Sequence, residues 1–94
     1  MFQVKQTNDD EIRLIGRFDA SQVEKANNAF EKIDKTVIVN LEELEYISSA
    51  GMGILLATQK RLNESNDQLK LVRMNDHIRD VFRYAGFDMI FEIE

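Results

Sequence analysis

The sequence contains no cysteine, no proline, no tryptophan and only one histidine, and these absences exclude several kinds of chemistry. Without cysteine the chain has neither a disulfide framework nor a thiolate metal site, and His77 alone cannot form a histidine cluster. We therefore expect no metal site, no redox chemistry and no cofactor.

Long apolar runs are also missing. No segment approaches the roughly 20 apolar residues that a membrane-spanning helix requires. The first residues, MFQVKQTNDD, lack the basic and long apolar stretches of a signal peptide. Only four glycines are present, and there is no linker, repeat or low-complexity segment. These features predict a single domain over 1–94 that acts in the cytoplasm and does not bind a membrane.

The charge balance excludes a further class of partner. The chain has 17 acidic and 12 basic residues, which gives a net charge of -5. The basic residues are scattered among the acidic ones, whereas binding to nucleic acid requires clustered lysine and arginine. The composition therefore favours a protein partner or a small ligand over nucleic acid.

The apolar pattern predicts an α/β fold. FQVKQ and EIRLIGRF alternate around the turn cluster TNDD, which is typical of an antiparallel hairpin. TVIVNL is a continuous β-branched run, typical of a central strand in a sheet with parallel pairing. QLKLVRM and DMIFEI are the other expected strands. We expect a mixed sheet of about five strands that begins with the hairpin.

Three segments have the spacing of amphipathic helices. Val23, Ala26, Phe30 and Ile33 share one face of the first helix, which Asp19 or Ser21 could cap. The second helix begins near residue 50. The third helix lies within NDHIRDVFRYAGF, and Gly86 fits just past its end, where a positive φ is commonly needed. At least three helices should therefore pack on the sheet.

The stretch YISSAGMGILL places two serines and two glycines at the start of the second helix. The first turn of a helix has unpaired N–H groups and a partial positive charge, so Ser48 or Ser49 can cap it, and a phosphate is tolerated there. Gly51 and Gly53 would leave this turn bare, so that a bulky partner can approach the hydroxyl group. The simpler alternative is that the serines only cap the helix and the glycines only allow packing against a strand.

The same stretch resembles the signature of the sulfate transporter and anti-sigma factor antagonist (STAS) domain family, especially its stand-alone bacterial anti-sigma factor antagonists. In that signature a strand ends in Asp or Asn and Leu, and an aromatic and an aliphatic residue precede a serine–glycine turn. GRFDA and the segment IRDVFRYAGFDMIFEI resemble two further parts of the family pattern. The matching positions of the signature are Asn40, Leu41, Tyr46, Ile47, Ser49, Gly51, Met52 and Gly53.

The resemblance implies a partner switch. The unphosphorylated domain binds an anti-sigma factor that is also a serine kinase, and a sigma factor is thereby released. Phosphorylation of Ser49, or less favourably Ser48, ends this binding, and a serine phosphatase restores it. ATP is bound by the kinase, and the domain itself is a monomer or weak dimer. The residues implied in partner binding are Asp19, Ser48, Ser49, Ala50, Gly51, Met52 and Gly53.

Two positions depart from the family pattern. Ser48 stands where the family has Asp, and Ala50 stands where it has Ser or Thr. The first departure favours an alternative function, a non-switching STAS scaffold or transporter-associated module that binds a protein through the same helix. A small-ligand-binding domain is a third possibility. Glu42, Glu43 and Glu45 precede the serines and are expected to form a solvated acidic segment that makes the partner surface locally acidic.

An enzyme is the least favoured class. ISSAG lacks the leading glycine of a Gly-x-Ser-x-Gly nucleophile turn, and His77 is the only histidine available as a base. GMG is too short for either glycine-rich phosphate-binding fingerprint. We therefore predict a protein that is not an enzyme.

Overall fold

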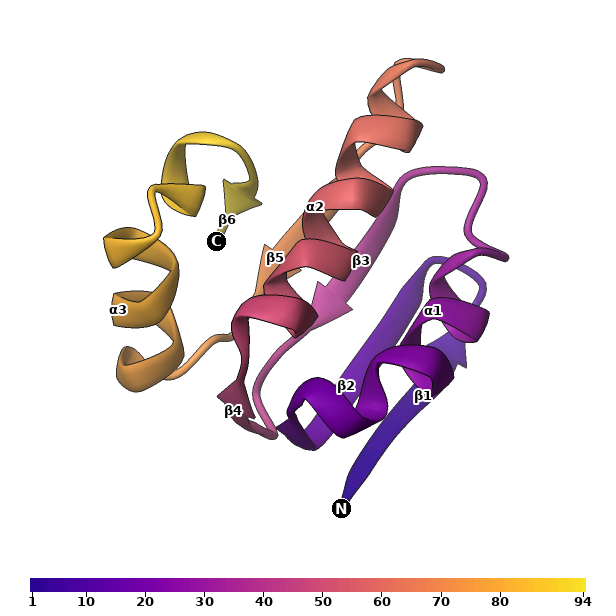
Figure 1. Cartoon of the computed structure of the whole chain (residues 1–94). Coiled ribbons are helices and arrows are strands. Elements are labelled where there is room, and N and C mark those ends of the chain that lie inside the picture. Colours follow the sequence, from indigo (N-terminus) through magenta and orange to yellow (C-terminus); the bar gives the residue numbers. More distant parts are fainter.

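The structure is a computed structural model that describes residues 1–94. It contains a six-stranded mixed sheet in the order β1-β2-β3-β5-β6, and β4 pairs with β2 (Figure 1). The α/β class, the N-terminal hairpin and the mixed sheet with three helices are confirmed. The strands are β1 (Phe2–Asn8), β2 (Glu11–Phe18), β3 (Val37–Asn40), β4 (Leu44–Ile47), β5 (Leu69–Val72) and β6 (Glu92–Ile93). The helices are η1 (Ala20–Gln22), α1 (Val23–Phe30), α2 (Ser49–Asn63), α3 (Asp76–Tyr84) and η2 (Phe87–Met89).

Only the first pair of strands is antiparallel. β1 and β2 form the predicted hairpin, and the Asn8 side chain accepts a hydrogen bond from the Asp10 backbone N–H at 2.8 Å in its turn. Near its other end, Gly16 has a φ of 93°, and a side chain there would start 2.2 Å from the Met1 carbonyl oxygen. Glycine is therefore required where the start of the chain lies against β2.

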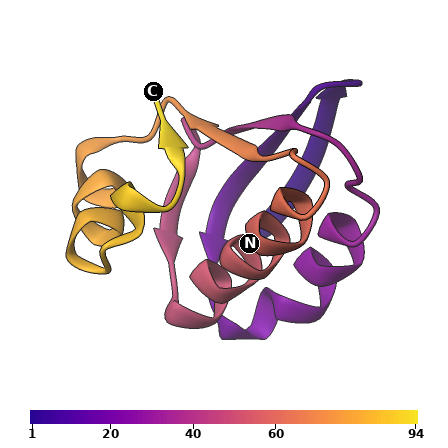
Figure 2. The same ribbon diagram turned by 90° about the horizontal axis from the view of Figure 1, so that it is seen from above.

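Helices cover one face of the sheet. α1 and α2 lie side by side on that face, and α3 lies at the β6 edge (Figures 1 and 2). On β2, the alternating residues Ile12, Leu14 and Phe18 are buried toward the helices, whereas Arg13 and Arg17 lie on the other face. This alternation is the one expected for a strand with one covered and one open face.

One strand was not predicted from the sequence. The sequence indicates a solvated acidic segment at Glu42, Glu43 and Glu45 and no strand, but residues 44–47 form β4, and Leu44 is completely buried. The first half of β2 pairs with β3 and its second half with β4, both in parallel. β3 and β4 thus follow one another along the same side of β2, and β4 leads directly into the start of α2.

The helix ends follow the predicted chemistry in part. Asp19 caps the short helix η1, so the first helical segment begins as a 3-10 turn before α1. Asn75 caps α3, and Gly86 follows it with a φ of 76° in the left-handed region, as predicted. The last strand is shorter than predicted, because residues 87–89 form η2 and only Glu92–Ile93 pair with β5. None of the helices has the length and apolar character to cross a membrane.

Candidate functional site

The start of α2 lies at the end of two parallel strands. Phe18 of β2 is paired with Ile47 of β4, and the Ser48 backbone N–H donates a hydrogen bond to the Phe18 carbonyl at 2.9 Å. Asp19 and Ser48 therefore leave the sheet side by side. We call residues 48–53 the serine turn, and Asp19 lies next to it.

Ser48 is the N-cap of α2. Its backbone is extended, with φ -87° and ψ 169°, and its Oγ accepts a hydrogen bond from the Gly51 N–H at 3.1 Å. Its carbonyl accepts another from the Met52 N–H at 2.9 Å. Ser48 is also partly buried. The predicted capping role of this serine pair is thus filled by Ser48.

Ser49 has a different environment. It is the first residue of α2 and is exposed, and its hydroxyl forms no hydrogen bond within the chain. The helix N-terminus places a partial positive charge beside it, which favours an added anion there. Of the two serines, Ser49 is the one whose oxygen is free for chemistry.

Asp19 is close to the serine turn but is bonded elsewhere. Its carboxylate accepts hydrogen bonds from the Ser21 N–H at 3.0 Å and from the Ser21 Oγ at 2.5 Å. These bonds, and then the charge of Arg17, hold the pKa of Asp19 below its ordinary value. Asp19 therefore keeps a negative charge beside the turn and caps η1, and it makes no hydrogen bond to Ser48 or Ser49.

The two glycines of the serine turn serve opposite purposes. Gly51 is buried, and a Cβ there would lie 3.1 Å from side-chain atoms of Phe18 and Ile47. Gly53 is exposed, and a Cβ there would meet nothing within 4 Å. The expectation that both glycines leave the first turn bare to a partner is therefore wrong for Gly51, which allows α2 to approach the sheet. It holds for Gly53.

The exposed face of the serine turn continues along α2. Ala50 is exposed, whereas Met52 is partly buried and packs against the core. Residues at spacings of four from Ser49 are Gly53 and Ala57, both exposed, and Lys60 follows three positions later. The exposed face of this helix beyond residue 53 was not predicted from the sequence. The same helical spacing would have identified Ala57 and Lys60.

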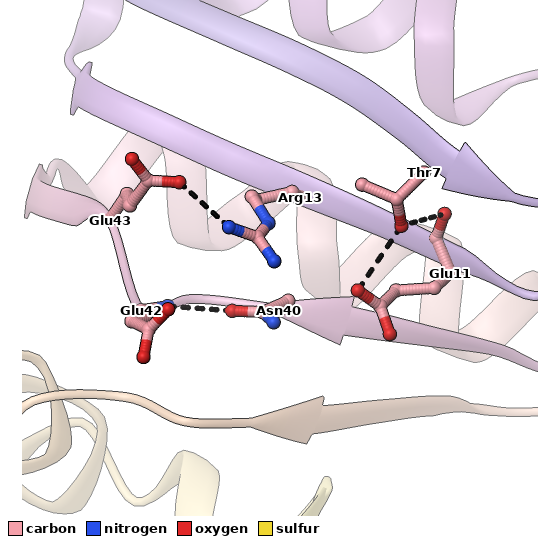
Figure 3. A network of polar contacts seen from close by, with 6 residues as sticks. All are labelled: Thr7, Glu11, Arg13, Asn40, Glu42 and Glu43. Carbon is pink, nitrogen blue, oxygen red and sulfur yellow. Dashed lines mark hydrogen bonds and ion pairs between the residues drawn. The ribbon is translucent and has the colours of Figure 1, made fainter.

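The acidic segment lies away from the serine turn. Glu43 forms an ion pair with Arg13 of β2 at 2.9 Å, and the Asn40 side chain accepts a hydrogen bond from the Glu42 N–H at 2.9 Å (Figure 3). The Glu43 bond also raises the pKa of Arg13. Glu42 and Glu43 precede β4 and Ser48 follows it, and a four-residue strand spans about 13 Å. Glu42 and Glu43 are therefore separated from the serine turn by the length of β4, whereas Glu45 lies within β4.

Side-chain hydrogen bonds fix the far half of α2. Gln59 is buried, accepts a hydrogen bond from the Leu69 N–H at 2.8 Å and donates one to the Ile90 carbonyl at 3.1 Å. Arg61 donates to the carbonyls of Ile33 at 2.7 Å and Phe30 at 2.9 Å. The helix that carries Ser49 is therefore held to β5, to the C-terminal segment and to the end of α1.

Comparisons with known proteins show the family of the chain. The family model described as "Mlab, STAS domain" matches residues 1–92. The chain is 33% identical over 81 residues to BtrV of Bordetella bronchiseptica, described as a candidate anti-sigma factor antagonist, and the match covers 85% of this chain and 70% of BtrV.

Solved structures share the fold. Unphosphorylated SpoIIAA, an anti-sigma factor antagonist, has a TM-score of 0.73 at 22% identity, over 100% of this chain and 88% of that chain. The phosphorylated form from Bacillus has a TM-score of 0.71 at 21% identity, over 100% of this chain and 91% of that chain. The resemblance drawn from the sequence is thereby confirmed, and the chain belongs to the STAS domain family.

Proposed function

We propose that this protein is an anti-sigma factor antagonist that works by partner switching. Its unphosphorylated form binds an anti-sigma factor that is also a serine kinase, and this binding releases a sigma factor. Phosphorylation of Ser49 ends the binding. The observation that carries the proposal is the exposed, unbonded hydroxyl of Ser49 at the N-terminus of α2, in a STAS chain 33% identical to BtrV.

The choice of Ser49 over Ser48 rests on accessibility. The Ser48 Oγ already accepts a hydrogen bond from the Gly51 N–H, and this residue is partly buried. Phosphorylation of Ser48 would modify the partly buried oxygen that caps α2, whereas phosphorylation of Ser49 modifies an exposed oxygen that makes no hydrogen bond and adds charge at the positive end of the helix. A kinase can reach Ser49 without disturbing the fold.

The partner-binding surface in this proposal is the serine turn with Asp19. Ser49, Ala50 and Gly53 are exposed and small, so a partner backbone can pack closely against α2. Gly51 lies on the buried side of the same turn and positions this surface, because it lets α2 pack against Phe18. Ala57 and Lys60 extend the surface along α2 to its last turn.

A phosphate on this surface is sufficient to break the complex without refolding. It adds about -1.5 to -2 charges at neutral pH. One contact near 4 Å between this phosphate and an acidic group of the partner costs on the order of 4 kcal/mol at an effective dielectric of about 20. Each ~1.4 kcal/mol is a tenfold change in affinity. Asp19 already places one negative charge beside the turn. Gln59 and Arg61 hold α2 in place, so the change is one of surface charge.

The other components follow from the same mechanism. The kinase partner supplies ATP, because the chain has no glycine-rich nucleotide fingerprint of its own. A serine phosphatase regenerates the binding form. We place this cycle in the cytoplasm, where the transcription machinery acts, with the chain as one non-enzymatic domain that is a monomer or weak dimer.

A second candidate function is a non-switching scaffold or a transporter-associated module. The observation that favours it is Ser48, which stands at the position where the STAS signature has Asp. The Ser48 side chain is used as a cap rather than as an acidic group beside Ser49. In that case the same face of α2 would bind a partner regardless of phosphorylation.

A pull-down from the lysate of the native cell separates these functions. The baits are wild type, Ser49→Ala, Ser49→Asp and the matched control Ser65→Asp, which adds the same charge to an exposed serine beyond the other end of α2. Retained proteins are identified by mass spectrometry, and the eluates are incubated with labelled ATP.

We expect wild type, Ser49→Ala and Ser65→Asp to retain a serine kinase and Ser49→Asp to lose it by tenfold or more, about 1.4 kcal/mol. Labelled phosphate should enter wild type but not Ser49→Ala. If all four baits retain one partner without kinase activity, the protein is a scaffold and the switch is wrong.

A further inference from the structure

A cavity of about 270 Å³ lies at the end of the sheet opposite the serine turn. It opens between the start of β2, the end of α1 and the segment that leads into β3. Five of its ten lining residues are hydrophobic, among them Val4, Ile12 and Ile33. Its volume corresponds to about nine liquid waters, which is the size of a small metabolite.

The mouth of this cavity carries charges of both signs. Lys32, Lys35, Asp9 and Asp34 line it. Lys35 is already paired, because its Nζ lies 3.1 Å from an Asp10 carboxylate oxygen. Lys32, Asp9 and Asp34 form no ion pair and no side-chain hydrogen bond within the chain. One cation and two carboxylates are therefore free at the rim of an apolar floor.

The two free carboxylates lie close to Lys35. They contribute to the raised pKa of Lys35, for which the hydrogen bond and charge of Asp10 are the larger causes and Asp9 and Asp34 add to them. Lys35 thus keeps its proton and remains paired with the Asp10 carboxylate. The charge left for a ligand is positive at Lys32 and negative at Asp9 and Asp34.

The cavity wall is preformed. Ile33 lines the cavity, and its carbonyl oxygen is held by the Arg61 guanidinium at 2.7 Å. The preceding turn is held in the same way, through the Phe30 carbonyl at 2.9 Å. A ligand entering here does not need to order the segment between α1 and β3, which lowers the cost of binding.

We propose that this cavity binds a free apolar α-amino acid. The apolar side chain would lie on the floor, the ammonium group would face Asp9 and Asp34, and the carboxylate would face Lys32. The ligand needs both an ammonium and a carboxylate group because the rim offers carboxylates for the first and Lys32 for the second. It needs an apolar side chain because half of the lining residues are hydrophobic. The cavity is small and open, so we expect dissociation constants of about 1 mM. This site does not depend on the anti-sigma function, because it involves neither Ser49 nor its kinase.

The test is an NMR titration of the ¹⁵N-labelled chain with L-leucine and L-phenylalanine. We expect saturable shifts at the amides of Ile12, Ala29 and Ile33 and none at Ser49. Free glycine has both charges but no side chain, so its binding tests whether the apolar floor contributes to affinity. N-acetyl-phenylalanine and phenylalanine amide each carry one charge, so they resemble the two ends of a peptide, and each should bind at least tenfold more weakly than phenylalanine.

Two pairs of variants locate the site. Ala29→Leu fills the cavity and should abolish the shifts, whereas Ala85→Leu, at an exposed position beside α3, should not. Lys32→Gln should weaken binding about tenfold, and Lys5→Gln on β1 should leave it unchanged. A thermal melt checks that each variant is folded. If Ala29→Leu unfolds, the comparison of Lys32→Gln with Lys5→Gln decides whether the amino acid binds in this cavity.

Each result has one meaning. Saturable shifts that require both charges and disappear with Ala29→Leu support the proposal. No saturation by about 10 mM, equal shifts with glycine, or unchanged binding by Lys32→Gln would overturn it. Tighter binding of either singly charged analogue would also overturn it and assign the cavity to a peptide terminus instead.

Discussion

The two halves of α2 differ in how they are attached to the protein. The N-terminal half has a free hydroxyl at Ser49 and open space at Gly53, and its buried residues Gly51, Ile54 and Leu55 pack inward without a side-chain hydrogen bond to another segment of the chain. The C-terminal half is fixed by the side chains of Gln59 and Arg61 to three other segments. The difference separates recognition from stability: changes at the exposed positions of the N-terminal half should alter binding, and changes at Gly51 or at the fixed C-terminal half should alter the free energy of unfolding.

The largest expected effect comes from placing the same side chain at both glycines. Gly51→Val pushes new methyl groups into Phe18 and Ile47, where even a Cβ is 3.1 Å away, and should lower the free energy of unfolding by about 3 kcal/mol. Gly53→Val meets open space and should raise it slightly, because valine is a better helix former than glycine. Urea unfolding of both variants measures this, and equal losses would contradict the inward and outward assignment.

The next effect is at the fixed end. Gln59→Ala leaves the buried Leu69 N–H without its partner and should cost about 2 kcal/mol in urea unfolding. Gln3→Ala, on the exposed part of β1, is the matched control and should change stability by less than about 0.5 kcal/mol. Binding of the kinase partner by Gln59→Ala should stay within about twofold while the protein is folded. A large loss of binding with little loss of stability would mean that the two halves of α2 are not separate in function.

A smaller effect separates the two adjacent serines. Ser48→Ala removes the cap of α2 and should cost about 1 kcal/mol, whereas Ser49→Ala should cost much less because its hydroxyl makes no hydrogen bond. In a kinase assay the order reverses, and only Ser49→Ala should abolish phosphate incorporation. The comparison fails if Ser49→Ala is the more destabilising of the two.

Much of this arrangement could be predicted from local sequence. The serine cap, the left-handed Gly86 and the hairpin depend on residues within a few positions of one another, and they were predicted. The different roles of Gly51 and Gly53 were also present in the sequence, as helical spacing. Gly51 is four residues before the buried Leu55, and Gly53 is four before the exposed Ala57.

Other features depend on contacts between distant parts of the chain. β4 is short and contains Glu45, so its local pattern resembles a linker, and it becomes a strand only because β2 is there to pair with it. Gln59 bonds to Ile90, which is 31 residues away, and no periodicity indicates such a pair. The cavity likewise combines residues from both strands of the hairpin, α1 and β3, so its existence could not be read from any one segment.

The smallest expected effect concerns the charge of Asp19 beside the serine turn. Its pKa is held below the ordinary value by Ser21, so its contribution to stability is present in full above about pH 4 and is lost as the pH falls through the lowered pKa. Asp19→Asn can still cap η1 but has no charge to lose. The difference in urea midpoint between wild type and Asp19→Asn should therefore be constant at neutral pH and shrink below about pH 4. A difference that stays constant down to about pH 2 would mean that the Asp19 carboxylate gains nothing from Ser21, and its place beside Ser49 would then have to be explained by partner binding alone.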